Sequence, residues 1–177
     1  MKIDETYKGL RRLKNGDYVL EGDLISKESI EIGLDNTLFV NGRINSDKDI
    51  KAKCNISVRD YIIAYGSIYA SGFIYAGESI LAGRYIYSCS RICADYNIRA
   101  DRFIYAGRYI HAGSSINSGQ FIRAREYIDA GQFIRAREYI DTYGNIYAGK
   151  SIKCAEIRKG KIVRGELIIA GGNDGNE

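Results

Sequence analysis

The sequence has no proline or tryptophan, one methionine and one histidine among its 177 residues. The hydrophobic residues, 45% of the chain, are dominated by Ile and Tyr. This bias favours β structure and internal repetition over a mixed globular core. The length allows one domain with a sizeable core and is too short for two large ones.

Metal-binding patterns are also missing. The four cysteines, Cys54, Cys89, Cys93 and Cys154, form no CxxC pair, and His111 has no second histidine to join it. Structural zinc sites and disulfide frameworks need clustered residues of these types. We therefore expect no metal, no cofactor and no disulfide framework.

Long apolar runs are absent. Residues 1–16 contain no apolar stretch of the kind found in a signal peptide, and no later segment approaches the length needed to span a membrane. The formal net charge of +4 is only mildly basic, which permits nucleic-acid binding without implying it. We expect a cytoplasmic protein of a bacterial host with no membrane partner.

A six-residue period runs through the chain. Ile occupies every sixth position from 44 to 152, and Ile32 and Leu38 extend the same period toward the N-terminus. The residue two positions later is Leu34, Val40, Ser46, Ala52 or Val58 in the first repeats and then mostly Ala, with Ser88, Ser118, Thr142 and Cys154 as exceptions. Each repeat therefore reads as a large apolar residue, any residue, and a small residue.

This spacing predicts one short strand per repeat, because residues two apart point to the same face of an extended chain. A helix is excluded, since a period of six moves successive Ile residues around the helix axis instead of keeping them on one stripe. Gly or Asp stands at many of the expected corners, as in Gly77, Gly83, Asp95 and Gly107. These residues adopt positive φ at low cost, so we expect left-handed backbone there.

Short strands separated by corners predict an all-β, single-domain parallel β-helix of triangular section, with about eighteen residues per coil and about seven coils. We expect residues 32–157 to form this solenoid and residues 1–31 to form an N-terminal cap with a short helix over Asp4–Leu13. Residues 158–177 are expected to supply capping strands and a disordered tail. The sequence leaves the handedness of the solenoid open.

A tandem copy fits this architecture. Residues 119–130 read GQFIRAREYIDA, and residues 131–142 repeat them except at the last position. Twelve residues are two repeats, so the copy keeps every Ile and Ala inward while it moves the outer residues to another face. Repeated surface residues of this kind are therefore weak evidence for a precisely placed site.

The repeats, as in SILAGRYIY and RFIYAGRYIHAG, resemble those of the left-handed β-helix acyltransferases, and phrases such as GNIYAGKSIKCA resemble bactofilins. The acyltransferase resemblance implies a catalytic histidine and an acyl-coenzyme A site between subunits. His111 is the only candidate base, and neither an interrupting loop nor an orienting partner is evident near it. A single histidine also excludes the trio of zinc ligands of a carbonic anhydrase of this fold.

The bactofilin resemblance implies end-to-end assembly through terminal apolar strands, for which residues 165–170 are candidates. The charged N-terminal residues argue against free polymerisation. Arrays of Ile-x-Ala-Gly repeats are also similar to those of small proteins carried by bacteriophages, some of which inhibit host defences.

Three repeats per coil place residues eighteen apart next to one another, and one face then becomes rich in aromatic and basic residues. The candidate binding surface consists of Tyr69, Tyr85, Tyr87, Phe103, Tyr105, Phe121, Arg123 and Tyr139, with Arg84, Arg102 and Arg108 beside them. Stacked rings stabilise adjacent strands, and Tyr and Arg also dominate binding hot spots. The sequence is compatible with both roles of these residues, stabilisation of the sheet and binding of a partner.

We expect a non-catalytic binding module. The favoured function is that of a phage-borne inhibitor that docks on a host protein, such as a nucleic-acid-processing effector of the CRISPR type. The expected partners are a second copy of the chain, a host protein, or both, and nucleic acid is a less favoured partner. The alternatives are a bactofilin-like scaffold and a hexapeptide acyltransferase.

Overall fold

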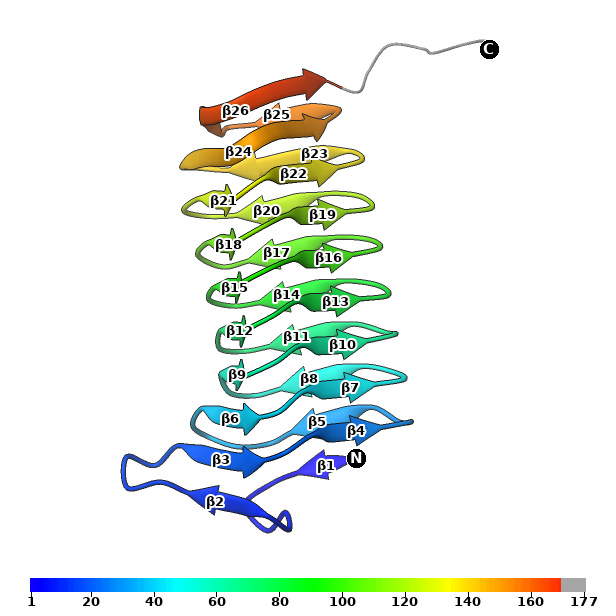
Figure 1. The fold of residues 1–177 in the computed structure, drawn as a ribbon, viewed down its shortest axis with the longest axis vertical. Helices are drawn as coiled ribbons and strands as arrows, with labels where there is room; N and C mark the ends of the chain where they lie inside the picture. Colours follow the sequence, from blue (N-terminus) through cyan, green and yellow to red (C-terminus); the bar gives the residue numbers. More distant parts are fainter. Residues whose placement is uncertain (170–177) are drawn as a thin grey trace.

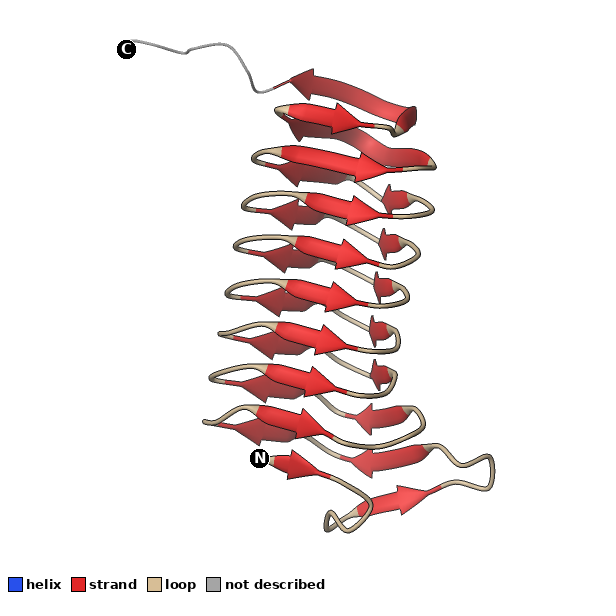
Figure 2. Cartoon of the chain, turned by 180° about the vertical axis from the view of Figure 1, so that it is seen from behind, coloured by secondary structure: helices blue, strands red, loops and turns tan. Residues whose placement is uncertain are grey.

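The computed structural model describes residues 1–169 and shows a parallel β-solenoid of about eight turns, with about 18 residues per turn (Figure 1). The described chain is built of strands and loops and contains no helix (Figure 2). Three stacks of strands form the three faces of the rod. The fold class predicted from the six-residue period is therefore confirmed.

Face 1 is a continuous parallel sheet. Its strands, from the N-terminal end of the rod, are β1 (Lys2–Ile3), β5 (Ile30–Ile32), β8 (Ile50–Ala52), β11 (Ile68–Ala70), β14 (Ile86–Ser88), β17 (Ile104–Ala106), β20 (Ile122–Ala124), β23 (Tyr139–Thr142) and β25 (Glu156–Arg158).

Faces 2 and 3 are joined near the C-terminal end, because β24 (Asn145–Cys154) and β26 (Lys161–Ile169) bend around the corner between them. Face 2 also contains β2 (Leu10–Arg12), β3 (Tyr18–Glu21), β6 (Leu38–Asn41), β9 (Ile56–Val58), β12 (Ile74–Ala76), β15 (Ile92–Ala94), β18 (Ile110–Ala112) and β21 (Ile128–Ala130). Face 3 contains β4 (Leu24–Ser26), β7 (Ile44–Ser46), β10 (Ile62–Ala64), β13 (Ile80–Ala82), β16 (Ile98–Ala100), β19 (Ile116–Ser118) and β22 (Phe133–Ala136).

The core consists of the periodic residues. Each Ile stacks on the Ile of the next coil, as Ile86 does on Ile104, and the Ile side chains from 44 to 152 on this period are fully buried. The small residues two positions later are buried beside them. Burial of each Ile stabilises the fold by about 1.5 to 3 kcal/mol before chain entropy is subtracted.

At some inward positions a Ser replaces the Ala, and its hydroxyl forms hydrogen bonds with backbone groups at the corner of the coil. The Ser88 hydroxyl donates to the Gly72 carbonyl, 2.7 Å away, and accepts from the Ser90 amide at 3.0 Å. In the same way, the Ser118 hydroxyl donates to the Arg102 carbonyl of the preceding coil and accepts from the Gln120 amide. A buried polar group costs little when it is hydrogen-bonded, so these exceptions to the Ala column are compatible with the core.

The first coil is longer than the others. β3 pairs with β6 in the register Tyr18↔Leu38, and Ile30 stacks on Ile50, so both steps span twenty residues. Ile32 therefore lies in the position of Ala52 and not in that of the large inward residue, as the six-residue period had predicted. The extra residues lie between β5 and β6, and strands from residue 18 onward already stack in the solenoid.

The predicted N-terminal helix over Asp4–Leu13 is wrong. The Asp4 carboxylate accepts bonds from the Thr6 amide (3.1 Å) and hydroxyl (2.7 Å), which holds a turn after β1. Gly9 has a φ of 87°, in the left-handed region where a helix cannot continue. β2 then pairs antiparallel with β3, so a hairpin and not a helix covers this end.

At corners of the central coils glycine provides space and not positive φ, whereas Gly22 and Gly165 have φ values of 86° and 116°. Gly77 and Gly107 lie outside the left-handed region, contrary to the expectation from sequence. A Cβ at Gly107 would lie 2.0 Å from the Cys89 carbonyl oxygen of the preceding coil. The close approach of the preceding coil therefore favours glycine at Gly107 and at Gly77, where a Cβ would lie 2.1 Å from the Arg59 carbonyl oxygen. The predicted disordered tail, residues 171–177, lies outside the described residues.

Candidate functional site

Face 1 carries two columns of aromatic rings, which we call the aromatic face. One column contains the residues between the Ile and the small residue of successive strands: Tyr69, Tyr87 and Tyr105. Neighbouring ring centroids are 5.1 and 4.9 Å apart, with interplanar angles of 7° and 6°. The strict parallel register stacks each ring on the next one.

The second column contains the residues that precede the Ile of each strand: Tyr85, Phe103, Phe121 and Tyr139. Their ring centroids are 4.8 to 4.9 Å apart and their planes are within 2° of parallel. The Arg158 guanidinium lies 3.8 Å from the centroid of Tyr139 and covers the end of this column. The aromatic rings are thus packed face to face along the rod axis and present their edges outward.

The Tyr87 hydroxyl of the aromatic face is uncharged near neutral pH, because its pKa is raised. The pKa of Tyr87 is raised first by the contact of its hydroxyl with the Cys89 thiol, 3.8 Å away, and then by burial. On face 2, burial and the neighbouring Tyr109 raise the pKa of Tyr127 to about 12. The columns of face 1 are amphipathic, because their rings are apolar and their tyrosines carry a polar hydroxyl.

The predicted arginines border the aromatic face but differ in their partners. Arg84 and Arg102 lie in successive coils at the corner between faces 3 and 1, where the Arg102 amide donates to the Arg84 carbonyl at 2.7 Å. Within residues 1–169 neither side chain has an acidic partner within ion-pair distance. These two guanidiniums are available for an external anionic group.

The other two predicted arginines are already neutralised. Arg108 lies at the opposite corner and pairs with Glu126 at 2.8 Å. Arg123 lies on face 1 itself and pairs with Asp141 at 2.7 Å, and Asp141 is only 5% exposed. The structure therefore divides the four predicted arginines into an unpaired corner pair and two residues that serve the fold.

Two hollows lie at the ends of the Tyr69 column. One, of about 330 Å³, is lined by Lys2, Glu31, Lys51, Lys53 and Tyr69 with neighbouring backbone. The other, of about 220 Å³, is lined by Tyr105, Arg123, Arg125, Asp141, Tyr143 and Lys159. The aromatic face is therefore a ridge with a depression at each end.

Tyr143 and Lys159 are additions that sequence reasoning missed. The Lys159 ammonium lies 3.1 Å from the Tyr143 hydroxyl and 4.5 Å from its ring centroid. Tyr143 stands eighteen residues after Arg125, so the coil period could have placed it at this corner. Lys159 follows the last full repeat, and its position depends on the path of the chain into β26.

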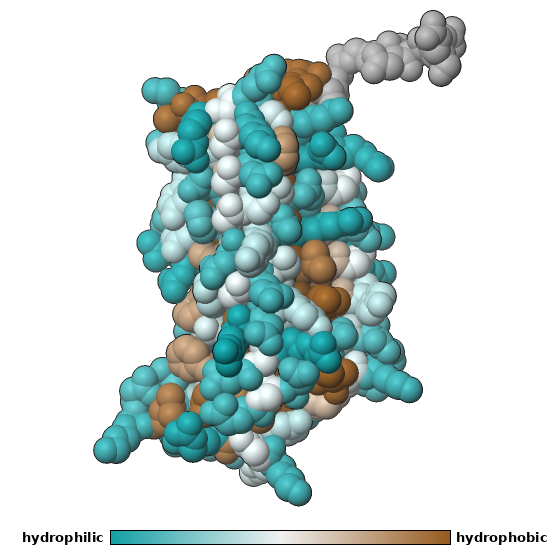
Figure 3. Space-filling view, in the orientation of Figure 1, coloured by the Kyte–Doolittle hydropathy of each residue, from teal (hydrophilic) through white to brown (hydrophobic). Residues whose placement is uncertain are grey.

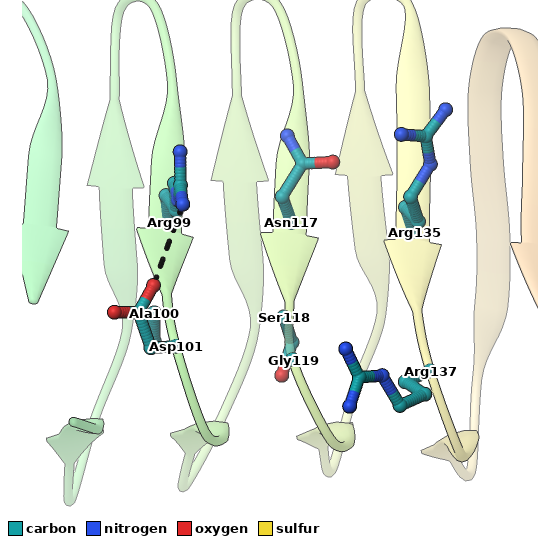
Figure 4. Close-up of a pocket in the computed structure, with 8 residues that line it drawn as sticks. All are labelled: Arg99, Ala100, Asp101, Asn117, Ser118, Gly119, Arg135 and Arg137. Carbon is teal, nitrogen blue, oxygen red and sulfur yellow. Dashed lines mark hydrogen bonds and ion pairs between the residues drawn. The ribbon is translucent and has the colours of Figure 1, made fainter. Parts of the chain in front are cut away.

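A basic groove crosses face 3. Figure 4 shows Arg99, Asn117 and Arg135 in a row on β16, β19 and β22, with Arg137 beyond the end of β22. The hollow has a volume of about 590 Å³, and one of its arginines, Arg99, lies 3.5 Å from Asp101. Sequence analysis proposed no site on this face.

His111 has an orienting partner that its local sequence did not reveal. The Asp129 carboxylate, one coil later on face 2, lies 3.2 Å from His111 Nδ1. Asp129 also lies 3.9 Å from an Arg164 nitrogen. The pairing follows from the eighteen-residue register of β18 and β21.

Within residues 1–169 there is no cluster of three metal-binding side chains. The same residues contain no helix of the length and apolar character required to cross a membrane. No family model, curated protein or solved structure matches this chain.

Proposed function

We propose that this protein is a rigid, non-catalytic binding module that docks on another protein through the aromatic face. The observation that carries the proposal is the pair of stacked aromatic columns on one flat sheet. Aromatic surface of this extent is uncommon on a monomer without a partner, and Tyr and Arg are the residues most enriched in hot spots.

Ring orientation favours a protein over a nucleic acid as the partner. Nucleobases bind aromatic side chains by stacking on free ring faces. Here the faces of the interior rings, such as Tyr87 and Phe103, are covered by their neighbours in the column. Ring edges and hydroxyls remain for contact, which suits the packed side chains of a protein interface.

The corner arginines specify the partner further. Arg84 and Arg102 lie beside an apolar and neutral surface, so a complementary partner has an apolar patch flanked by carboxylates. Within this proposal, the protein acts as a phage-borne inhibitor, and the partner is a host protein such as a nucleic-acid-processing effector of the CRISPR type. Rigidity of the solenoid limits the entropy lost on binding.

The test is capture from nuclease-treated lysate of the native host, with three forms of the protein as bait. Wild type should retain a specific protein, identified by mass spectrometry, that Y87D/Y105D loses. Y96D is the matched control, because Tyr96 is 59% exposed and lies at the corner between faces 2 and 3. Each interaction is then repeated with the purified partner.

The proposal predicts that the purified partner binds wild type and Y96D alike and binds Y87D/Y105D at least tenfold more weakly. Circular dichroism should show that all three proteins are folded. Equal binding of the face 1 variant would contradict the proposal. Retention that is lost after nuclease treatment and falls steeply with salt would favour nucleic acid instead.

The acyltransferase alternative gains one contact from the structure. Asp129 could hold the His111 ring with Nδ1 as donor and leave Nε2 to accept a proton, as a general base requires. We propose that this pair instead stabilises neighbouring strands, because contacts between side chains on adjacent strands commonly stabilise a sheet. Acyl transfer from an acyl-coenzyme A that disappears in H111A would overturn this view.

A further inference from the structure

The two ends of the rod are finished differently. At the N-terminal end, β1 and the β2–β3 hairpin cover the core, and Tyr7 and Leu10 pack against it. Ile3, Tyr18 and Leu20 are buried there. This end therefore presents a closed surface.

At the C-terminal end, the last strand leaves the core uncovered. Leu167 and Ile169 continue the inward columns of Ile152 and Cys154, yet they are 42% and 52% exposed. Figure 3 shows hydrophobic residues gathered at this end of the rod. Residues 170–177, AGGNDGNE, carry none of the large apolar side chains of the six-residue repeat.

The same strand also has an open edge. β26 pairs with β24 on one side, and among residues 1–169 no strand pairs with its other side. It is nine residues long, against three for most strands of the rod. Long strand edges with unpaired backbone groups are templates for another strand.

The sequence of β26, KIVRGELII, is complementary to itself when it is reversed about Gly165. Antiparallel pairing of two copies about this residue places Arg164 opposite Glu166 of the partner subunit. It also places Val163 opposite the partner's Leu167. Opposite charges and apolar pairs directly across strands both stabilise antiparallel sheets.

We propose that a second copy of this chain binds here, through antiparallel pairing of the two β26 strands in a tail-to-tail dimer. Gly165 lies at the corner between faces 2 and 3, where its φ of 116° bends the strand. The two-fold axis of this dimer is perpendicular to the rod and passes through this corner. It places face 2 of one subunit in line with face 3 of the other, so the two β26 strands bend around the same corner. With no side chains, the two Gly165 residues can approach closely.

This symmetry determines where the aromatic faces and the N-terminal ends lie in the dimer. The same axis passes through the middle of face 1, which lies opposite that corner, so both aromatic faces point to the same side of the doubled rod. The covered N-terminal ends lie outermost and stop further growth. The dimer is therefore closed and presents two docking surfaces in line.

A charge exchange tests the dimer with the full chain. Light scattering coupled to gel filtration should give about twice the chain mass of 19.8 kDa for wild type. R164E and E166R each place like charges opposite each other twice in the symmetric interface, and each should give the monomer mass. The double variant R164E/E166R restores both pairs with their signs reversed, and it should return to the dimer mass.

The double variant also separates the interface from the contact of Arg164 with Asp129 of its own chain. The double variant has Glu at position 164, so it lacks the Arg164–Asp129 contact just as R164E does. If loss of that contact caused the dissociation, the double variant would also be a monomer. Circular dichroism of all variants should match that of wild type. A monomeric wild type, open-ended growth, dimeric single variants or a monomeric double variant would each overturn the proposal.

Discussion

Gly107 lies at the corner between β17 and β18, where its coil passes close to the preceding coil. Substitution by Ala would bring a methyl group to 2.0 Å from the Cys89 carbonyl oxygen and 2.7 Å from its carbon. These neighbours are backbone atoms, so the coil itself must shift. We expect G107A to lower the free energy of unfolding by about 1 to 3 kcal/mol, as measured by denaturant titration.

Arg125 provides the matched control for Gly107, because it occupies the same corner position one coil later and its side chain is exposed. R125A should change the free energy of unfolding by less than about 0.5 kcal/mol. An equal loss in both variants would show that the corner, and not the close approach at Gly107, determines the cost.

The four cysteines should differ in reactivity. Burial raises the pKa of Cys54 to about 11 and also raises the pKa of Cys93 and Cys154. A thiol of pKa 11 is only about one part in a thousand thiolate at pH 8, and the thiolate is the reactive form. Cys89 is exposed at a corner.

Iodoacetamide at pH 8 should therefore label Cys89 first and Cys54 only after unfolding. A time course analysed by peptide mass spectrometry measures this order. C89S should leave the labelling rates of the other three cysteines unchanged. Labelling of Cys54 in the native protein as fast as Cys89 would contradict its burial.

At the scale of strands, the tandem copy creates an ion pair. Arg123 comes from the first copy and Asp141 from the second, and the eighteen-residue register places them side by side on β20 and β23. Asp141 Oδ2 accepts a bond from Arg123 Nε at 2.8 Å, and Asp141 Oδ1 has no hydrogen-bond partner in the described chain, so Arg123 is the principal partner of this buried carboxylate. Removal of one side chain of this ion pair leaves the charge of the other without its partner.

A double-mutant cycle measures this pair. R123A should lower the free energy of unfolding by about 1 to 2 kcal/mol, since Arg123 is half exposed, and should cost less in the D141A background. Chemical denaturation of the four proteins gives the coupling energy. Additive losses would show that the two side chains act independently.

Sequence reasoning predicted the strands of the central coils well, because Ile and a small residue repeat there without interruption. It failed where other forces decide the local structure. The Asp4–Thr6 turn and the φ of Gly9 replaced the predicted helix, and the longer first coil hid the position of Ile32. A six-residue period extrapolated along the sequence does not show where a corner contains two additional residues.

The same limit applies to the site. Residues eighteen apart could be assigned to the aromatic face from the period alone, because the register transmits sequence spacing directly into contact. The period does not tell which charges pair across coils. Arg108 and Arg123 turned out to have acidic partners one coil away, whereas Arg84 and Arg102 do not within residues 1–169.

At the scale of the whole molecule, the rod should accept the loss of a complete coil. Deletion of residues 113–130 joins Ala112 to Gly131 and keeps every downstream Ile inward and every outer residue on its own face. We expect a folded protein with cooperative thermal unfolding and a reduced melting temperature. Circular dichroism measures both.

Deletion of residues 113–129, one residue fewer, is the control. It shifts every downstream residue by one position and turns the inward Ile side chains outward, because strand side chains alternate between faces. This protein should lose cooperative unfolding. Comparable melting of the two deletions would show that the stacked columns do not determine the fold.

The central claim is that the aromatic face contacts a host protein, and site-specific photo-crosslinking in the native host tests it most directly. A photoreactive phenylalanine analogue replaces Tyr87 in one form of the protein and Tyr96 in the other. We predict that irradiation links a specific host protein to position 87 and not to position 96. Crosslinks from position 96 alone, or equally from both positions, would contradict the claim.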